Sequence, residues 1–245
     1  MASTSETGHA VNMANFKKII DRCVEFGTDY NPPNADIAIA TMTAKWTSVD
    51  GLHSDYLAAL EDTKLPINER EILFDNLNKI VVRSVNLYES TKASSQAKKD
   101  AAGYKLKITG QKTKIKKLQD GTPDPNYVSK SQRSFTQRVN NFEKLVRFYE
   151  TDANYAPNEN TLKIASLETM LGNLKTANEN VNQLVVRAIQ KRIERNHGLY
   201  DVGTGIYDLS VACKKYVKSL YGAMSPEALS VVAFKLRRVM KLSAV

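Results

Sequence analysis

Two acid and histidine pairs in the chain have the spacing of a metal-binding motif. Glu194 and His197 are three residues apart, and so are Asp50 and His53. In helical di-metal bundles, a Glu-x-x-His pair on each of two helices joins a glutamate from each of two others. Bridging carboxylates inside apolar stripes are not evident here, and we expect a helix to end near Gly198, directly after His197. We therefore expect no metal ligands and keep a metal-binding helical bundle as an alternative.

Nucleophilic catalysis has no support in the residue pattern. It needs a serine, cysteine or threonine beside a base and an orienting group. The chain has three histidines, and His9 falls in a segment that we expect to be a flexible tail. Cys23 and Cys213 each lie in an apolar helical pattern, which is typical of small buried residues. The sequence contains no phosphate-binding glycine loop, Gly-x-Ser-x-Gly or Cys-x-x-Cys motif. We expect no catalytic residue and no cofactor.

Basic residues are the feature that points to a partner. The net charge is +9, from 35 basic and 26 acidic residues, and the stretch from Lys98 to Lys117 holds one acid, Asp100. Such a surface attracts polyanions, and each phosphate contact adds salt-dependent affinity. The run has a single aromatic residue, Tyr104, so binding to nucleic acid is expected to be weak and sequence-tolerant. The candidate polyanion-binding residues are Lys105, Lys107, Lys112, Lys114, Lys116, Lys117, Lys235, Arg237, Arg238 and Lys241.

Length and composition indicate a folded chain that can bury a sizeable core. The 245 residues are 42% hydrophobic and 25% charged, which excludes wholesale disorder, collagen and a small disulfide-stapled domain. The N-terminus lacks the basic and apolar regions of a secretory signal, and no apolar run is long enough to span a bilayer. We therefore expect a cytoplasmic protein with reduced cysteines.

The chain that positions these residues has the marks of an internal duplication. Asn15-Phe16 recurs as Asn141-Phe142, and Tyr30-Asn31-Pro32 recurs as Tyr155-Ala156-Pro157. Ordered matches at nearly constant offset are typical of tandem repeats. A duplicated fold must keep its core faces, so three pairs of residues are expected to be buried at equivalent positions: Phe16 with Phe142, Ile37 with Leu162, and Ile80 with Ile206.

Each repeat has helical periodicity, which predicts an all-α fold of two similar bundles with about four helices each. Ser225-Pro226 is a helix start, and the helix after it is expected to bury Leu229. Residues 104–118 alternate as a hairpin does but also share a helical face, and we favour helix. The expected organisation is a flexible tail at 1–11, one bundle at 12–118, a linker at 119–130 and a second bundle at 131–242.

The pattern of Asn-Phe, then Cys23, then Tyr-Asn-Pro with Ile37 beyond, and Tyr-x-Pro in the second repeat, resembles tandem-repeat helical proteins that are common in Bacteroidota. The resemblance covers both repeats and implies the helical fold. It implies no activity, because none is attached to that group.

These observations favour a non-catalytic cytoplasmic scaffold or protein-interaction protein that acts through its surfaces. A protein partner or self-association is expected, and no small-molecule substrate is evident. The alternative is polyanion binding through the lysine-rich face.

Overall fold

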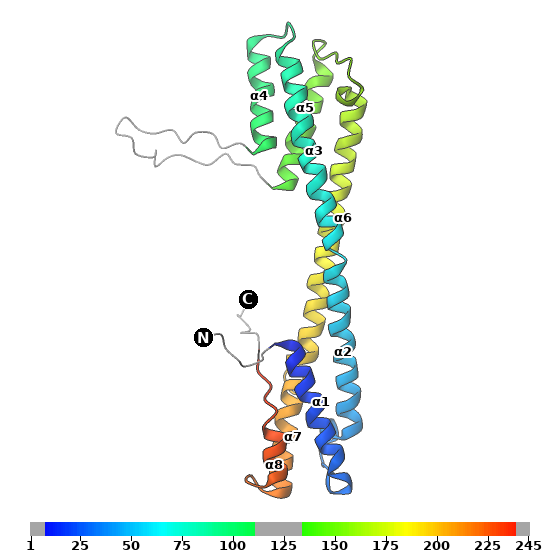
Figure 1. The fold of residues 1–245 in the computed structure, drawn as a ribbon, viewed down its shortest axis with the longest axis vertical. Helices are drawn as coiled ribbons and strands as arrows, with labels where there is room; N and C mark the ends of the chain where they lie inside the picture. The colour runs from blue at the N-terminus through cyan, green and yellow to red at the C-terminus, as the bar shows by residue number, and fades with distance from the viewer. Residues whose placement is uncertain (1–7, 111–133, 239–245) are drawn as a thin grey trace, which may run out of the picture. The chain divides into compact units, whose positions relative to one another are not determined.

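The computed structural model describes residues 8–110 and 134–238, and all the regular structure in these ranges is helical (Figure 1). The predicted all-α class is confirmed. None of the described helices is both long and apolar enough to cross a membrane. The α-helices are α1 (His9–Glu25), α2 (Ile39–Glu61), α3 (Lys64–Glu89), α4 (Ser95–Thr109), α5 (Phe135–Thr151), α6 (Ile164–Tyr200), α7 (Ile206–Tyr221) and α8 (Pro226–Val232), with short 3₁₀ turns at Gly27–Asp29, Ala35–Ile37 and Asn160–Leu162.

Serine caps explain where several helices begin. The hydroxyl of Ser94 accepts the backbone N–H of Ala97 at 3.2 Å, and the hydroxyl of Ser225 accepts that of Ala228 at 3.1 Å. Such a bond satisfies one of the N–H groups that a helix leaves without a partner at its start. The predicted start at Ser225 is confirmed, and α4 confirms the helical interpretation of residues 104–109.

The described residues form two compact units, and neither unit is one half of the chain. Unit 1 contains the residues up to Glu61 and those from Val185 onward, whereas unit 2 runs from Asp62 to Leu184. Unit 1 therefore holds α1, α2, α7, α8 and the C-terminal part of α6. Unit 2 holds α3, α4, α5 and the N-terminal part of α6. The structure thus divides the chain differently from the expected bundles at 12–118 and 131–242.

Each unit has one core that joins segments from before and after residues 119–130. In unit 1, Phe16 and Cys23 of α1 cluster with Cys213 and Val217 of α7. In unit 2, Phe74 and Tyr88 of α3 cluster with Phe142 of α5, among others. The expectation that each repeat buries its own core is corrected by this packing. The physical reason is that apolar stripes of the same kind occur before and after residues 119–130, so a stripe on one side finds a partner on the other.

The same turn joins α1 to α2 in unit 1 and α5 to α6 in unit 2. The Tyr30 hydroxyl donates to the carbonyl oxygen of Ile37 at 2.8 Å, and the Tyr155 hydroxyl donates to that of Leu162, also at 2.8 Å. Ile37 and Leu162 are both buried, as predicted. In each turn a buried tyrosine therefore satisfies a backbone carbonyl seven residues further along the chain.

Other burial predictions have mixed outcomes. Phe16 and Phe142 are both fully buried, as expected. Ile206 is buried but Ile80 is only partly buried, because Leu77 of α3 takes the core position. Leu229 is 48% exposed, so its predicted burial is wrong; α8 ends at Val232 and buries Ala228 and Val231 instead.

The predicted N-terminal tail is shorter than expected, and the predicted linker cannot be compared with the structure. Residues 9–11 belong to α1 and not to the predicted tail at 1–11. The predicted linker at 119–130 and residues 111–118 lie outside the described residues.

Candidate functional site

The residues of the two metal-like motifs lie on α6 and α2 of unit 1 but do not converge. The Glu194 carboxylate accepts hydrogen bonds from Lys191 at 3.0 Å and Gln190 at 3.2 Å, and these bonds lower its pKa. His197 is exposed and contacts Asp201 at 2.8 Å. Within residues 8–110 and 134–238, no three His, Cys, Asp or Glu side chains gather as metal ligands do. Glu194 instead belongs to a network of ion pairs.

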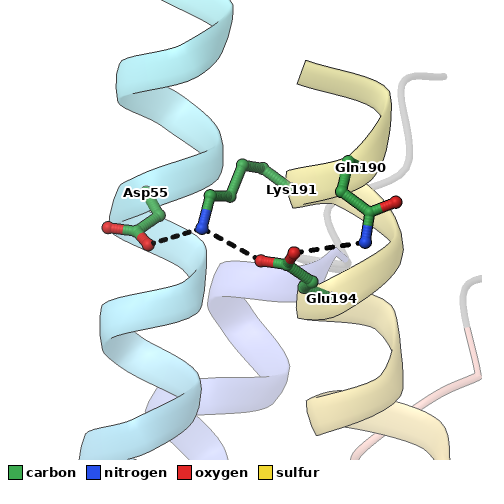
Figure 2. A network of polar contacts seen from close by, with 4 residues as sticks. All are labelled: Asp55, Gln190, Lys191 and Glu194. Carbon is green, nitrogen blue, oxygen red and sulfur yellow. Dashed lines mark hydrogen bonds and ion pairs between the residues drawn. The ribbon is translucent and has the colours of Figure 1, made fainter. Parts of the chain in front are cut away.

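That network joins α6 to α2. Figure 2 shows Lys191 between two carboxylates, with its ammonium 3.2 Å from Asp55 of α2 and 3.0 Å from Glu194. Both partners raise the pKa of Lys191. Further along, Gly198 packs closely on α2, since a Cβ there would lie 2.9 Å from Cγ2 of Val49. The sequence predicted that the helix ends near Gly198. In the structure α6 continues two residues further, to Tyr200.

A buried cation lies near this contact. Arg195 of α6 is only 4% exposed. Its guanidinium donates to the Asn196 amide oxygen at 2.8 Å and lies 4.4 Å from the centre of the Tyr56 ring. Burial lowers its pKa. An amide oxygen and an aromatic ring thus accompany this buried guanidinium.

Two histidines surround Arg195 from other helices. His9 Nδ1 of α1 lies 3.0 Å from the Tyr200 hydroxyl, to which Asn12 also donates at 3.0 Å. Burial, followed by the charges of Arg195 and His53, lowers the pKa of His9 from 6.5 to about 4. Burial and Arg195 also lower the pKa of His53, against the opposing effect of Asp50. Both imidazoles are therefore neutral near pH 7, and protonating either would place a second cation beside Arg195.

The described polyanion candidates are divided between the two units and have structural contacts. In unit 2, Lys105 lies 3.9 Å from Glu89, and the Lys107 ammonium lies 5.8 Å from the Tyr104 ring. In unit 1, Arg238 pairs with Asp208 at 3.1 Å. The backbone oxygens of Lys235 and Arg237 accept hydrogen bonds from the Asn15 and Asn12 side chains. Lys112, Lys114, Lys116, Lys117 and Lys241 lie outside the described residues.

Six apolar side chains are exposed on the faces of α2 and α6 that are turned away from the ion pair, and we call them the apolar strip. Asp55 and Lys191 mark one side, and Leu57 and Ile189 are each two residues away from them. Two residues turn a helix by about 200°, so these apolar side chains face the other side. The strip consists of six residues of unit 1 that are each 39–65% exposed: Leu57, Leu60, Val185, Val186, Ile189 and Ile193.

The same face of α2 is covered by α1 one turn earlier. Trp46, His53 and Leu57 are spaced by seven and four residues, so they share a face of the helix. Trp46 donates its ring N–H to the backbone oxygen of Met13 of α1 at 3.2 Å, and His53 is close enough to His9 to affect its pKa. Beyond His53, at Leu57, the apolar face becomes exposed. The strip is therefore a continuation of a surface that already accommodates a helix.

A hollow on unit 2 is lined by charged side chains that pair with one another. It is open to solvent between α5 and α6, and its lining includes Glu143, Arg147 and Glu168. Glu143 already pairs with Arg147 at 3.1 Å and with Lys175 at 3.0 Å, contacts that lower its pKa. The charge of Glu143 in this hollow is therefore balanced by Arg147 and Lys175.

No protein-family model, curated protein or solved structure matches the chain. The geometry of the described residues is therefore the basis for the proposals that follow.

The sequence analysis did not identify the buried cluster around Arg195 or the apolar strip. One available signal was a seven-residue spacing on α6. Leu167, Leu174, Val181 and Ala188 are all buried, and Arg195 is the next position in that series. A constant seven-residue spacing keeps residues close to one helix face, so it predicts a buried arginine there.

Proposed function

We propose that the protein is a non-catalytic, cytoplasmic helical scaffold or interaction protein that binds an amphipathic helix of another chain along the apolar strip. The observation that carries this proposal is that two helices of unit 1, α2 and α6, expose six large apolar side chains. Contiguous exposed apolar surface is typical of a docking site, whereas single exposed leucines are ordinary. The helix belongs either to a different protein or to a second copy of this chain.

The packing of α1 supports a helix as the bound element. α1 already lies on the preceding turns of α2, where Trp46 and His53 contact or face it. Helix-in-groove recognition uses apolar anchors spaced by three, four and seven residues. Leu57 with Leu60, and Val186 with Ile189 and Ile193, have this spacing. A partner helix can therefore pack on the strip as α1 packs on the turns before it.

Site-specific photo-crosslinking tests the proposal. A photoreactive amino acid replaces Ile189 in the strip or, in a matched control, Met224 of unit 1, which is 82% exposed outside the strip. We expect crosslinking to one defined protein, or to a second copy, from position 189 only. Adding Leu57→Glu should abolish that product, because a buried carboxylate is costly in an apolar interface. Equal crosslinking from both positions, or a product that survives Leu57→Glu, would contradict the proposal.

The second candidate function is weak polyanion binding, favoured by the lysines of α4. Lys98, Lys99, Lys105 and Lys107 lie on this one helix with a single acid, Asp100. A salt titration of DNA and RNA binding tests it, since each neutralised phosphate steepens the salt dependence. This candidate predicts measurable affinity at about 50 mM salt that Lys99→Gln with Lys107→Gln weakens for all sequences alike. It is rejected if no binding near micromolar affinity is found.

We also infer that the two units come from an internal duplication in which the copies exchanged their second halves. The matching tyrosine turns support this inference, as do the serine caps at Ser94 and Ser225. A further correspondence lies between α1 of unit 1 and α5 of unit 2, each of which contacts a helix from the other half of the chain. Cys23 of α1 meets Cys213 of α7, and Tyr149 of α5 meets Ser84 of α3.

A further inference from the structure

The two cysteines of the chain lie side by side in the core of unit 1. Cys23 Sγ of α1 and Cys213 Sγ of α7 are 3.4 Å apart, and both residues are 0% exposed. They are 190 positions apart in the sequence, so their contact arises from folding alone. A disulfide needs an S–S distance of about 2.05 Å, which the pair can reach if the sulfurs approach by about 1.4 Å. The sequence interpretation treated each as an isolated buried residue.

We propose that Cys23 and Cys213 form a reversible disulfide under oxidising conditions, which locks α1 onto α7. The inference is independent of the apolar strip. The neighbouring hydroxyl of Tyr30 lies 3.3 Å from Cys213 Sγ and is hydrogen-bonded to the carbonyl oxygen of Ile37. In unit 2 the contact of Tyr149 with Ser84 has no sulfur, so the redox response is confined to unit 1.

The oxidant is a small-molecule disulfide such as oxidised glutathione. Once α1 separates from α7, either cysteine can supply the first thiolate; the exchange has the same two steps in both cases, and with Cys213 first it begins at the Cys213 thiolate. That thiolate attacks one sulfur of the small disulfide, forms a mixed disulfide and releases one thiol. Cys23 then loses its proton, attacks Cys213 Sγ and releases the second thiol. Two electrons pass to the small disulfide, which is reduced to two thiols, and the protein gains one S–S bond.

Because both cysteines are buried, disulfide formation depends on a local opening of the contact between α1 and α7. The mixed disulfide does not fit between packed helices, so the exchange requires α1 to separate from α7 and then to return. Once formed, the bond restricts the unfolded chain through a long loop, which stabilises the folded state. Oxidation should therefore raise the melting temperature of the transition that involves unit 1.

The test uses the full chain in glutathione buffers of increasing oxidised fraction, approached from both the reduced and the oxidised protein. Refolding from urea in the same buffers removes the barrier to access. We expect a monomer lighter by two hydrogens, with no free thiol after denaturation, a raised melting temperature and full reversal by dithiothreitol. Digestion should yield one linked peptide that contains both cysteines.

Matched variants distinguish the internal bond from other products. Cys23→Ser and Cys213→Ser have no second cysteine to displace glutathione, so each should end with one free thiol or one mixed disulfide, form no internal bond and lose the rise in melting temperature. The proposal is overturned if wild-type protein ends as a mixed disulfide with glutathione, as a disulfide-linked dimer, or with two free thiols after refolding in the most oxidising buffer.

Discussion

His9 and His53 are kept neutral by burial and by the charge of Arg195, and their neutrality is a condition for stable packing of α1 in unit 1. The pKa of His9 is about 4 in the folded chain and 6.5 when unperturbed. Between these values the unfolded chain binds the proton and the folded chain does not. The free energy of unfolding therefore decreases as the pH falls from 6.5, and the contribution is fully lost below about 4. Above pH 6.5 neither state is protonated and the contribution is constant.

This linkage predicts a change in acid sensitivity for two variants. His9→Gln removes one proton-binding group, and Arg195→Met removes the charge that, after burial, contributes to lowering the pKa of both histidines. Each variant should lose less stability than wild-type protein between pH 6.5 and 4.5. Urea unfolding midpoints at several pH values measure the slopes. Identical slopes for wild type and both variants would show that the histidines do not carry the effect.

Arg195→Met also tests the cost of the buried cation. Replacing a buried charge by an apolar residue of similar size is often neutral or stabilising. We expect the free energy of unfolding at pH 7.5 to stay within about 1 kcal/mol of wild type or to rise. A loss of about 3 kcal/mol or more would mean that the contacts with Asn196 and Tyr56 exceed the desolvation cost of the guanidinium.

At the scale of elements, the two tyrosine turns connect consecutive helices in each unit. Tyr30→Phe and Tyr155→Phe each remove a hydroxyl and leave a buried carbonyl without its hydrogen bond. Each change should lower the free energy of unfolding by about 1–3 kcal/mol, with little change in helix content. Urea unfolding followed by circular dichroism measures it. If either substitution is neutral, the bond in that turn does not contribute to stability.

The pairing of helices predicts which segments respond to a core truncation. Phe16→Ala should cost about 3–5 kcal/mol, because it leaves a cavity in unit 1. Amide hydrogen exchange should accelerate in α7, which packs on α1 although it is far away in the sequence. Phe142→Ala should instead accelerate exchange in α3 and α4. Acceleration in α4 after Phe16→Ala, with α7 unaffected, would favour the sequence-based pairing over the observed one.

Local elements could be predicted from the sequence because their signals are local. Apolar periodicity indicated helices such as α1 and α5, the Ser225-Pro226 start indicated α8, and the core residues Phe16 and Phe142 followed from the apolar pattern. The choice of partner could not be predicted, since similar apolar stripes occur before and after residues 119–130. The apolar strip was missed for a related reason. Leu57 and Ile189 continue apolar patterns that the sequence makes look buried, and only the structure shows that both side chains are exposed.

At the scale of the whole molecule, each unit takes part of its core from before and part from after residues 119–130. Unit 1 joins α1 and α2 to α7 and α8, and unit 2 joins α3 and α4 to α5. Neither half of the chain contains a complete core. Folding of one half therefore requires the other, and the contacts of both units depend on residues far apart in the sequence.

Separating the chain between Asn126 and Tyr127 tests this account most directly. The two fragments, 1–126 and 127–245, are purified apart and studied by circular dichroism at concentrations where sedimentation shows each to be monomeric. We predict that neither fragment alone shows a cooperative thermal transition. An equimolar mixture should recover the helix content and the transition of the intact chain. Cooperative folding of each fragment alone, unchanged on mixing, would contradict the shared cores and support two independent sequential bundles.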